Sequence, residues 1–318
     1  MKKSDVRIIF MGTPDFAVAT LKALIDNKFN VVGVITAPDR PSGRGRKLNQ
    51  SAVKKYALDQ QLTILQPTNL KDESFLDELK SLNANLQIVV AFRMLPKVVW
   101  QLPALGTFNL HASLLPNYRG AAPIHWAVIN GETKSGVTTF FIDEKIDTGK
   151  IILQEETTID VRDITGDLHN KLMNLGSQLV VKTVELIQKG EVKTIVQKVT
   201  KDTNFEAPKI FKETCKIDWQ QSLDAIYNKI RGLNPYPGSW SVLNNNEEVF
   251  EVKIYKVRKE KESHRYIIGK IICTKNELKV AVKNGYIFID EIQLPNKRKM
   301  KVKDLLNGYS FHENAYLK

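Results

Sequence analysis

The stretch VRIIFMGTPDFAVATLKALIDNKFNVVGVIT, residues 6–36, decides the fold class. It begins with an apolar run, Val6–Met11, which is typical of a strand buried on both faces. The turn Gly12–Asp15 leads into Phe16–Asn27, where apolar residues recur near helical spacing. A second apolar run follows at Val31–Thr36. This order predicts two parallel strands joined by a crossover helix.

The alternation of strands and helices continues over the following 150 residues or so. Further strands are predicted at Thr63–Gln66, Gln87–Ala91, Thr107–Leu110, Val137–Ile142 and Ile151–Gln154, the last antiparallel to its predecessor. Helices are predicted at Ser51–Gln60, Asp72–Ser81 and Ile164–Gln188. The pattern predicts an α/β fold with a doubly wound, Rossmann-like, mostly parallel sheet. Because there is no Gly-x-Gly-x-x-Gly loop, a dinucleotide ligand is not indicated.

The pattern changes near residue 204. Residues 204–209 predict a linker between a first domain, 1–203, and a second domain, 210–318. In the second domain short strands follow one another with Asn/Gly turns, at Trp240–Leu243, Phe250–Arg258, Gly269–Ile272, Lys279–Val282 and Tyr286–Gln293. Several short strands at close spacing predict a small β-barrel or sandwich.

The composition excludes several classes of protein. The two cysteines, Cys215 and Cys273, lie far apart, which fits a reducing compartment and gives no metal-ligand spacing. The five histidines form no ligand set either, so we expect no metal. The apolar run near the N-terminus is too short for a signal peptide, and no run approaches the ~18 residues that span a bilayer. We therefore expect a cytoplasmic, monomeric protein without a membrane partner.

The net charge of +12 is distributed unevenly. Residues 1–206 carry 26 Lys and Arg against 22 Asp and Glu, whereas residues 207–318 carry 21 against 13. A basic second domain favours binding to nucleic acid with salt-sensitive affinity. Solubility alone is the other explanation of such a charge.

The segment TFNLHASLLPNYRG, residues 107–120, places two polar groups at the end of a buried strand. Asn109 and His111 share one face because side chains alternate along a strand. An amide and an imidazole directed at one point can stabilise an oxyanion. Asp147, in a turn after a later strand, could fix the tautomer of the imidazole. Taken singly, each residue also has an ordinary structural role, in the core or in a turn.

A second informative segment is PDRPSGRGRK, residues 38–47. It gathers Arg40, Arg44, Arg46 and Lys47 around two glycines, which allow sharp backbone bends. Such a cluster suits an RNA backbone or an unpaired RNA end. A solvated surface loop has a similar composition.

Five stretches together resemble one enzyme family. They are RIIFMGTPDFA, PDRPSGRGRKL, FNLHASLLPNYRGAAPIHWAVINGE, GVTTFFIDEKIDTGKII and the later KIDW with IRGLNPYPGSW. They resemble the formyltransferases that use 10-formyltetrahydrofolate, from about residue 6 to about residue 310, less densely after Trp240. The resemblance implies a Rossmann-like catalytic domain followed by an OB-like, tRNA-binding barrel. It also implies formyl transfer from 10-formyltetrahydrofolate to the α-amino group of methionyl-initiator tRNA.

The resemblance also implies roles for individual residues. Asn109 and His111 would stabilise the oxyanion, and Asp147 would keep His111 charged and help to move a proton. The folate would contact Phe92, Arg93, Met94, Ser113, Leu114, Leu115 and Pro116. The tRNA would contact Arg40, Arg44, Arg46, Lys47, Lys209 and Lys212. Arg93 departs from the commoner form of the family, which has a small, glycine-containing segment there.

Two alternatives compete with this interpretation. One is another 10-formyltetrahydrofolate-dependent formyltransferase or hydrolase that acts on a small molecule; the basic loop 38–47 and the basic second domain argue against it. The other is a nucleic-acid-binding module with an inactive transferase half. The presence of Asn109, His111 and Asp147 together argues against that second alternative.

Overall fold

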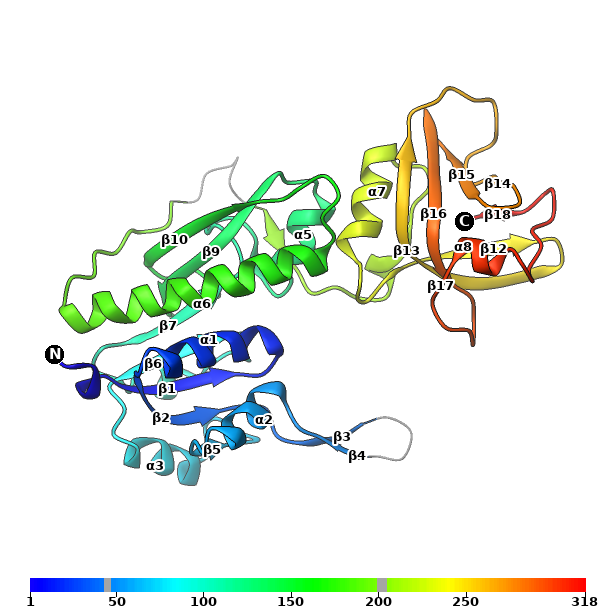
Figure 1. Cartoon of the computed structure of the whole chain (residues 1–318). Helices are drawn as coiled ribbons and strands as arrows, with labels where there is room; N and C mark the ends of the chain where they lie inside the picture. Colours follow the sequence, from blue (N-terminus) through cyan, green and yellow to red (C-terminus); the bar gives the residue numbers. More distant parts are fainter. Residues whose placement is uncertain (43–46, 199–204) are drawn as a thin grey trace. The chain divides into compact units, whose positions relative to one another are not determined.

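The computed structural model describes residues 1–42, 47–198 and 205–318 (Figure 1). The chain forms two compact units, each built from more than one segment. The first unit comprises Met1–Gly120, Ser135–Thr157 and His169–Glu206. The second unit comprises Ala121–Lys134, Thr158–Leu168 and Ala207–Lys318. The sequence-based boundaries 1–203, 204–209 and 210–318 remain a prediction.

A seven-stranded sheet forms the centre of the first unit, with the strand order β10-β9-β7-β6-β1-β2-β5 among the described residues. Its strands are β1 (Arg7–Gly12), β2 (Asn30–Ile35), β5 (Ile64–Leu65), β6 (Leu86–Val90), β7 (Thr107–His111), β9 (Lys134–Phe141) and β10 (Ile151–Thr158). The pairs β1–β2, β1–β6, β2–β5 and β6–β7 are parallel, and β7–β9 is antiparallel. The predicted mostly parallel sheet is confirmed.

Helices pack on both faces of this sheet, as a doubly wound fold requires. They are η1 (Lys3–Asp5), α1 (Asp15–Asp26), α2 (Ala52–Asp59), α3 (Glu73–Ser81), α4 (Lys97–Trp100) and α6 (Thr165–Lys189). On one face, Leu79 of α3 and Val99 of α4 join a core cluster with Met11 and Val89. On the other face, α6 runs along the sheet (Figure 1), and a hydroxyl–hydroxyl bond of 2.8 Å joins its Thr183 to the sheet.

The starts of α2 and α3 follow from side-chain caps. The hydroxyl of Ser51 accepts a hydrogen bond from the backbone N–H of Lys54, and the carboxylate of Asp72 accepts one from Ser74. Both caps satisfy an N–H group that has no partner within its own helix. The predicted helix starts at Ser51 and Asp72 are therefore the cap positions themselves.

Two short strand pairs lie outside the main sheets. β3 (Arg40–Ser42) and β4 (Lys47–Asn49) form an antiparallel ribbon, and β8 (Arg119–Gly120) pairs with β11 (Glu206–Ala207). The sequence analysis did not predict these pairs, since strands of two or three residues carry no measurable period.

The second unit is an antiparallel sheet with the order β14-β15-β16-β13-β12-β18, with β17 paired to β16. Its strands are β12 (Ser239–Asn245), β13 (Glu248–Glu260), β14 (Ile271–Cys273), β15 (Leu278–Val282), β16 (Gly285–Gln293), β17 (Met300–Lys301) and β18 (Tyr316–Leu317). A bridge between Lys270 and Tyr316 joins the two ends of this order, so the barrel is nearly closed. The predicted small barrel is confirmed, and the alternative of a sandwich is not.

The second unit also contains short helices, which are α5 (Pro123–Ile129), η2 (Glu213–Cys215), α7 (Leu223–Gly232) and α8 (Val302–Leu305). Helix α7 was not predicted, although its signals are present in the sequence. Ser222 caps the helix by accepting from Ala225 N–H, and Leu223, Ile226 and Ile230 recur at helical spacing in the barrel core.

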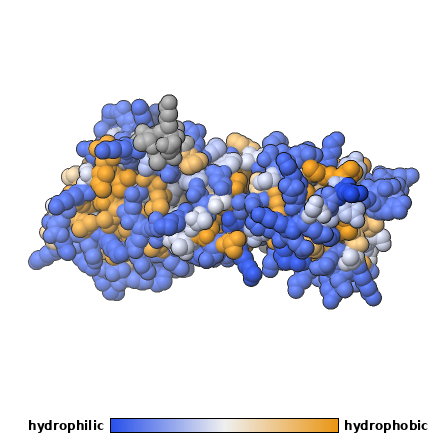
Figure 2. All heavy atoms as spheres, turned by 90° about the horizontal axis from the view of Figure 1, so that it is seen from above, coloured by the Kyte–Doolittle hydropathy of each residue, from blue (hydrophilic) through white to orange (hydrophobic). Residues whose placement is uncertain are grey.

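On the face that Figure 2 shows, hydrophilic residues predominate, and apolar residues form one broad group at the left of the view and smaller groups elsewhere. Within the described ranges, each helix is too short or too polar to cross a bilayer.

Candidate active site

Asn109 and His111 lie at the carboxyl end of β7, in the interior of the sheet. Asn109 is opposite Val89 of β6 on one side and Phe140 of β9 on the other. Leu110, between the two polar residues, faces α6, because a Cβ added at Gly176 of that helix would meet Leu110 at 2.8 Å. The two polar side chains therefore share the opposite face, as their spacing predicts.

Both ring nitrogens of His111 have a polar neighbour. Its side chain is only 8% exposed, and Nε2 lies 2.8 Å from the carbonyl oxygen of Tyr118. Since a carbonyl only accepts hydrogen bonds, Nε2 carries a hydrogen. Nδ1 lies 3.8 Å from Oδ2 of Asp147. The hypothesis drawn from the sequence required these two side chains to lie close together, although 35 residues separate them along the chain.

Asp147 is held in a turn with left-handed backbone, at a φ of 54°. Its Oδ2 accepts a hydrogen bond of 2.9 Å from the N–H of Gly120, whose φ of 122° suits only glycine. Residues 118–120 thus contact both side chains, with a carbonyl for His111 and an N–H for Asp147. A short backbone segment therefore sets the separation between imidazole and carboxylate.

The amide of Asn109 has a different environment. The side chain is half-buried and forms no hydrogen bond with the residues that the structure describes. A partly desolvated amide without a partner costs free energy, on the order of 1–3 kcal/mol. Nδ2 is therefore a donor available to a ligand beside His111.

The segment 113–116, predicted to bind folate, is fixed to the sheet by a buried hydroxyl. Oγ1 of Thr138 donates to the carbonyl of Ser113 at 2.6 Å and accepts from the N–H of Leu115 at 3.2 Å. Nε2 of Gln154 donates to the Leu115 carbonyl at 2.8 Å. The side chain of Leu115 packs with Phe140. These four contacts, made by Thr138, Gln154 and Phe140, hold the segment in place, so any contacts to a ligand come from its other atoms.

Phe92, Arg93 and Met94 follow the end of β6, the parallel neighbour of β7, so they lie at the same edge of the sheet as His111. The guanidinium of Arg93 donates to the carbonyls of Pro67 and Thr68. Burial, and then repulsion from Arg40, lowers its pKa. Met94 is 71% exposed. Arg93 thus anchors this loop, while Met94 is accessible to a ligand.

The predicted RNA-binding loop begins at an anchored residue. Asp39 pairs with Lys54 at 2.6 Å and accepts from Gln66 at 2.9 Å. The hydrogen bond from Gln66, followed by the one from Lys54, lowers the pKa of this carboxyl. Arg40 is exposed at the start of β3. Arg44 and Arg46 lie outside the described residues, and of Lys47 only the backbone, at the start of β4, is described.

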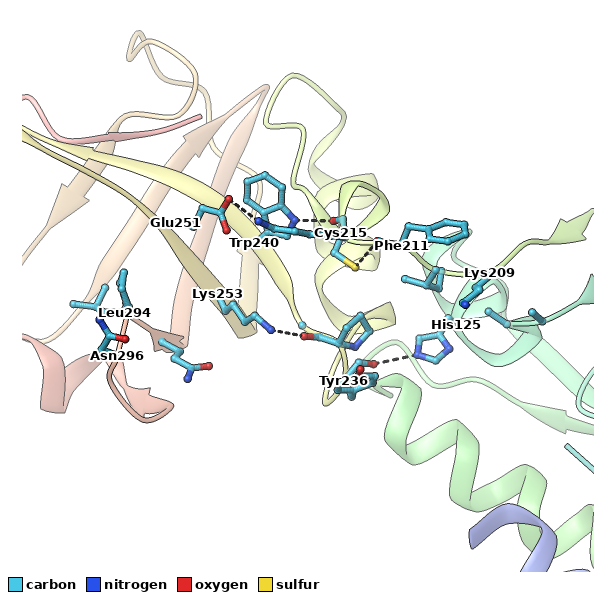
Figure 3. A pocket seen from close by; sticks show the side chains of 18 residues that line it. His125, Lys209, Phe211, Cys215, Tyr236, Trp240, Glu251, Lys253, Leu294 and Asn296 are labelled. Carbon is cyan, nitrogen blue, oxygen red and sulfur yellow. Dashed lines mark hydrogen bonds and ion pairs between the residues drawn. The ribbon is translucent and has the colours of Figure 1, made fainter. Parts of the chain in front are cut away.

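Lys209 and Lys212 lie in the second unit, where they line a cavity of about 840 Å³ (Figure 3). Nζ of Lys212 pairs with Glu251 at 2.9 Å and lies 5.1 Å from the ring centre of Trp240. Lys209 lies 5.6 Å from the ring of Phe211, which is 58% exposed. The wall combines cations and exposed aromatic rings, which is the composition of single-strand nucleic-acid sites.

The structure adds residues that the sequence analysis missed. Thr138 supports the segment 113–116, the backbone of Tyr118 and Gly120 holds His111 and Asp147, and Gln197 bonds to the backbone of Asp147. Of these residues, only Gly120 has a signal in the sequence, because a glycine, here after Tyr-Arg, is typical of an unusual backbone conformation. Thr138 and Gln197 carry none, because nothing local distinguishes them.

Two family models match the chain. One, described as formyl transferase, matches residues 6–184, and the other, described as formyl transferase, C-terminal domain, matches residues 209–310. Together they identify the class of protein as a formyl transferase with a C-terminal domain.

Curated relatives narrow the class. The methionyl-tRNA formyltransferase of Flavobacterium johnsoniae is 60% identical over 310 residues, which are 98% of each chain. That of Bacteroides fragilis is 53% identical over 322 residues, or 100% of this chain and 99% of the relative. The chain therefore belongs to the formyltransferase family, among its methionyl-tRNA formyltransferases.

Solved structures have the same fold. The sugar 3N-formyl transferase WlaRD, solved in the presence of dTDP and 5-N-formyl-THF, has a TM-score of 0.66 at 25% identity, covering 92% of this chain and 99% of its own. HypX from Aquifex aeolicus, in complex with tetrahydrofolic acid, has a TM-score of 0.63 at 16% identity, over 95% of this chain and 47% of its own.

Proposed function

We propose that this protein transfers the formyl group of 10-formyltetrahydrofolate to the α-amino group of methionine esterified to initiator tRNA. Because the product serves translation initiation, we place the reaction in the cytoplasm. The observation that carries the proposal is the 60% identity to a methionyl-tRNA formyltransferase over 98% of the chain. The juxtaposition of Asn109, His111 and Asp147 supports it.

The residues of the site divide the chemistry between them. 10-formyltetrahydrofolate supplies the formyl carbon, to which the amine nitrogen bonds. Nδ2 of Asn109 donates to the formyl oxygen, where negative charge develops as that bond forms. The described residues form no hydrogen bond with this amide, which leaves it available for the contact.

His111 and Asp147 handle the proton that the attacking amine must lose. Since the Tyr118 carbonyl occupies Nε2, Nδ1, which lies near Asp147, is the nitrogen left for proton transfer. The distance of 3.8 Å between Nδ1 and Oδ2 is too long for a direct hydrogen bond. A proton therefore passes between the two side chains through the attacking amine or through a bridging water. The proton ends on the nitrogen of tetrahydrofolate that loses the formyl group, so charge and atoms balance.

The binding roles follow the layout of each unit. In the first unit, Phe92–Met94 and Ser113–Pro116 flank the end of β7 and would hold the folate. The loop around Arg44 would contact the acceptor end of the tRNA. In the second unit, Lys209 lies beside the exposed ring of Phe211 and Lys212 beside the half-buried ring of Trp240, and both lysines would contact another part of the RNA.

The test compares acceptors. The purified protein receives 10-formyltetrahydrofolate with methionyl-initiator tRNA, free methionine or an amino sugar nucleotide, and the formylated product is quantified. We expect rapid formylation of the tRNA alone. Faster formylation of a small amine, or hydrolysis of the donor without an acceptor, would reject the proposal.

Two variants test the site. Asn109→Ala and His111→Ala should each lower kcat by about 10²–10³-fold, because each removes a group that acts on the transition state. Asn174→Ala is a matched control, since Asn174 is exposed on α6. Near-normal turnover of either site variant would remove these residues from the mechanism.

A further inference from the structure

An extended segment after α6 sends one polar side chain toward the candidate site. Ile195 forms an antiparallel bridge with Ile151, which fixes the segment beside the start of β10. Ile195 and Val196 are 65% and 64% exposed, whereas Gln197 is half-buried. In this segment the two apolar side chains are exposed and the polar one is half-buried. Packing into an apolar core therefore does not explain the position of Gln197.

The amide of Gln197 uses its full hydrogen-bonding capacity. Nε2 donates to the carbonyls of Asp147, at 3.0 Å, and Gly149, at 2.8 Å. Oε1 accepts from Nε of Arg119, at 3.2 Å, and from a second guanidinium nitrogen. Carbonyls only accept and a guanidinium only donates, so this orientation of the amide is the one that satisfies all four contacts.

The two segments that Gln197 joins are those that position the candidate catalytic groups. Arg119 lies between Tyr118, whose carbonyl holds Nε2 of His111, and Gly120, whose N–H holds Oδ2 of Asp147. Asp147 belongs to the other segment. One amide therefore ties the turn that carries the carboxylate to the loop that orients both side chains.

We propose that Gln197, acting through Arg119, is a positioning residue for formyl transfer that fixes the carboxylate of Asp147 relative to His111. This inference rests on the proposed function of Asp147 and His111. Gln197 does not touch the reacting atoms; it sets the separation between His111 and Asp147, which act on them. A misplacement of about 1 Å at a reacting centre can cost about 10²-fold in rate.

Two substitutions separate the parts of the contact. Gln197→Leu removes all four hydrogen bonds at similar volume. Gln197→Glu keeps the acceptor for Arg119 but places a carboxylate oxygen against two carbonyls, so the turn at Asp147 is repelled. We expect kcat to fall about 10- to 100-fold in both variants, with little change in KM for either substrate. Gln178→Glu, on an exposed position of α6, is the matched control and should be unchanged.

A double-mutant cycle tests whether the effect passes through Asp147. We expect Gln197→Leu to lower kcat in the native background but not in an Asp147→Asn background. A merely structural role predicts the same factor in both backgrounds, in parallel with a loss of folded protein measured by circular dichroism. That result, or a kcat of Gln197→Leu within twofold of native, would overturn the positioning role.

The cycle also separates the two proposals. If Asp147→Asn itself retains native turnover, the proposed function of Asp147 fails whatever Gln197 does. If Asp147→Asn is inactive while both Gln197 variants are fully active, only the positioning role fails.

Discussion

Replacing Gly149 by alanine is the sharpest structural test of the site. Gly149 lies two residues after Asp147, in the same turn. A Cβ at this position would lie 1.6 Å from the carbonyl oxygen of Phe141 in β9 and 2.9 Å from its carbonyl carbon. The obstacle is backbone, so no side-chain rotation relieves the contact.

The size of the displacement follows from these distances. Ordinary contact for a Cβ begins at 3.4 Å, so the turn and β9 must separate by about 1.8 Å. The separation strains two hydrogen bonds, from Phe141 N–H to the Lys150 carbonyl at 3.0 Å and from Gln197 to the Gly149 carbonyl at 2.8 Å. Overpacking of this kind typically costs about 1–3 kcal/mol of stability. A shift above 1 Å near Asp147 should lower kcat by about 10²-fold or more.

The assay measures kcat for formylation and the melting temperature of Gly149→Ala and of Gly308→Ala. Gly308 is the matched control because a Cβ there would meet nothing within 4 Å. We expect the control to behave as native and Gly149→Ala to lose both activity and stability. Native kcat and melting temperature in Gly149→Ala would show that the turn is not locked against β9, and the reasoning would fail.

Three further predictions concern other parts of the chain. Burial, together with the hydrogen bond to Glu248, raises the pKa of Tyr309 in the folded protein to about 12. As the pH rises, the unfolded chain loses this proton first, so the free energy of unfolding falls between about pH 10 and 12. Tyr309→Phe should flatten that decline, as measured by urea unfolding at each pH. Ile254→Ala empties a fully buried position in the barrel core and should cost about 2–5 kcal/mol by chemical denaturation. Arg44→Ala should raise KM for the tRNA and leave folate binding unchanged in a titration; equal losses for both substrates would contradict its role.

The sequence predicted elements where a local signal was strong. The apolar runs in residues 6–36 and the caps Ser51 and Asp72 correspond to strands and helices in the structure. In the second unit β12 to β16 were predicted, whereas the two-residue strands β17 and β18 and the ten-residue helix α7 were not, because such short elements give a weak periodic signal. The β3–β4 ribbon has too few residues to show any period.

The candidate site was predictable only in part. Asn109 and His111 are two positions apart on a strand, so their shared face follows from geometry alone. Their link to Asp147 was a chemical hypothesis that the resemblance strengthened, because 35 residues separate Asp147 from His111 and no local pattern joins them. The support of the folate segment by Thr138 could not be anticipated, since a threonine within a strand has no distinguishing local pattern.

The sequence by itself determined the main strands and several of the longer helices, the order of a mostly parallel sheet followed by a small all-β domain, and the shared face of an amide and an imidazole. These properties depend on periodicity and composition, which are local. Tertiary structure alone decided the 3.8 Å approach of Asp147 to His111, the fixing of Nε2 by the Tyr118 carbonyl and the bridging role of Gln197. Each of these depends on contacts between residues distant along the chain, and such contacts exist only when the sheet, its loops and the segment after α6 are packed together.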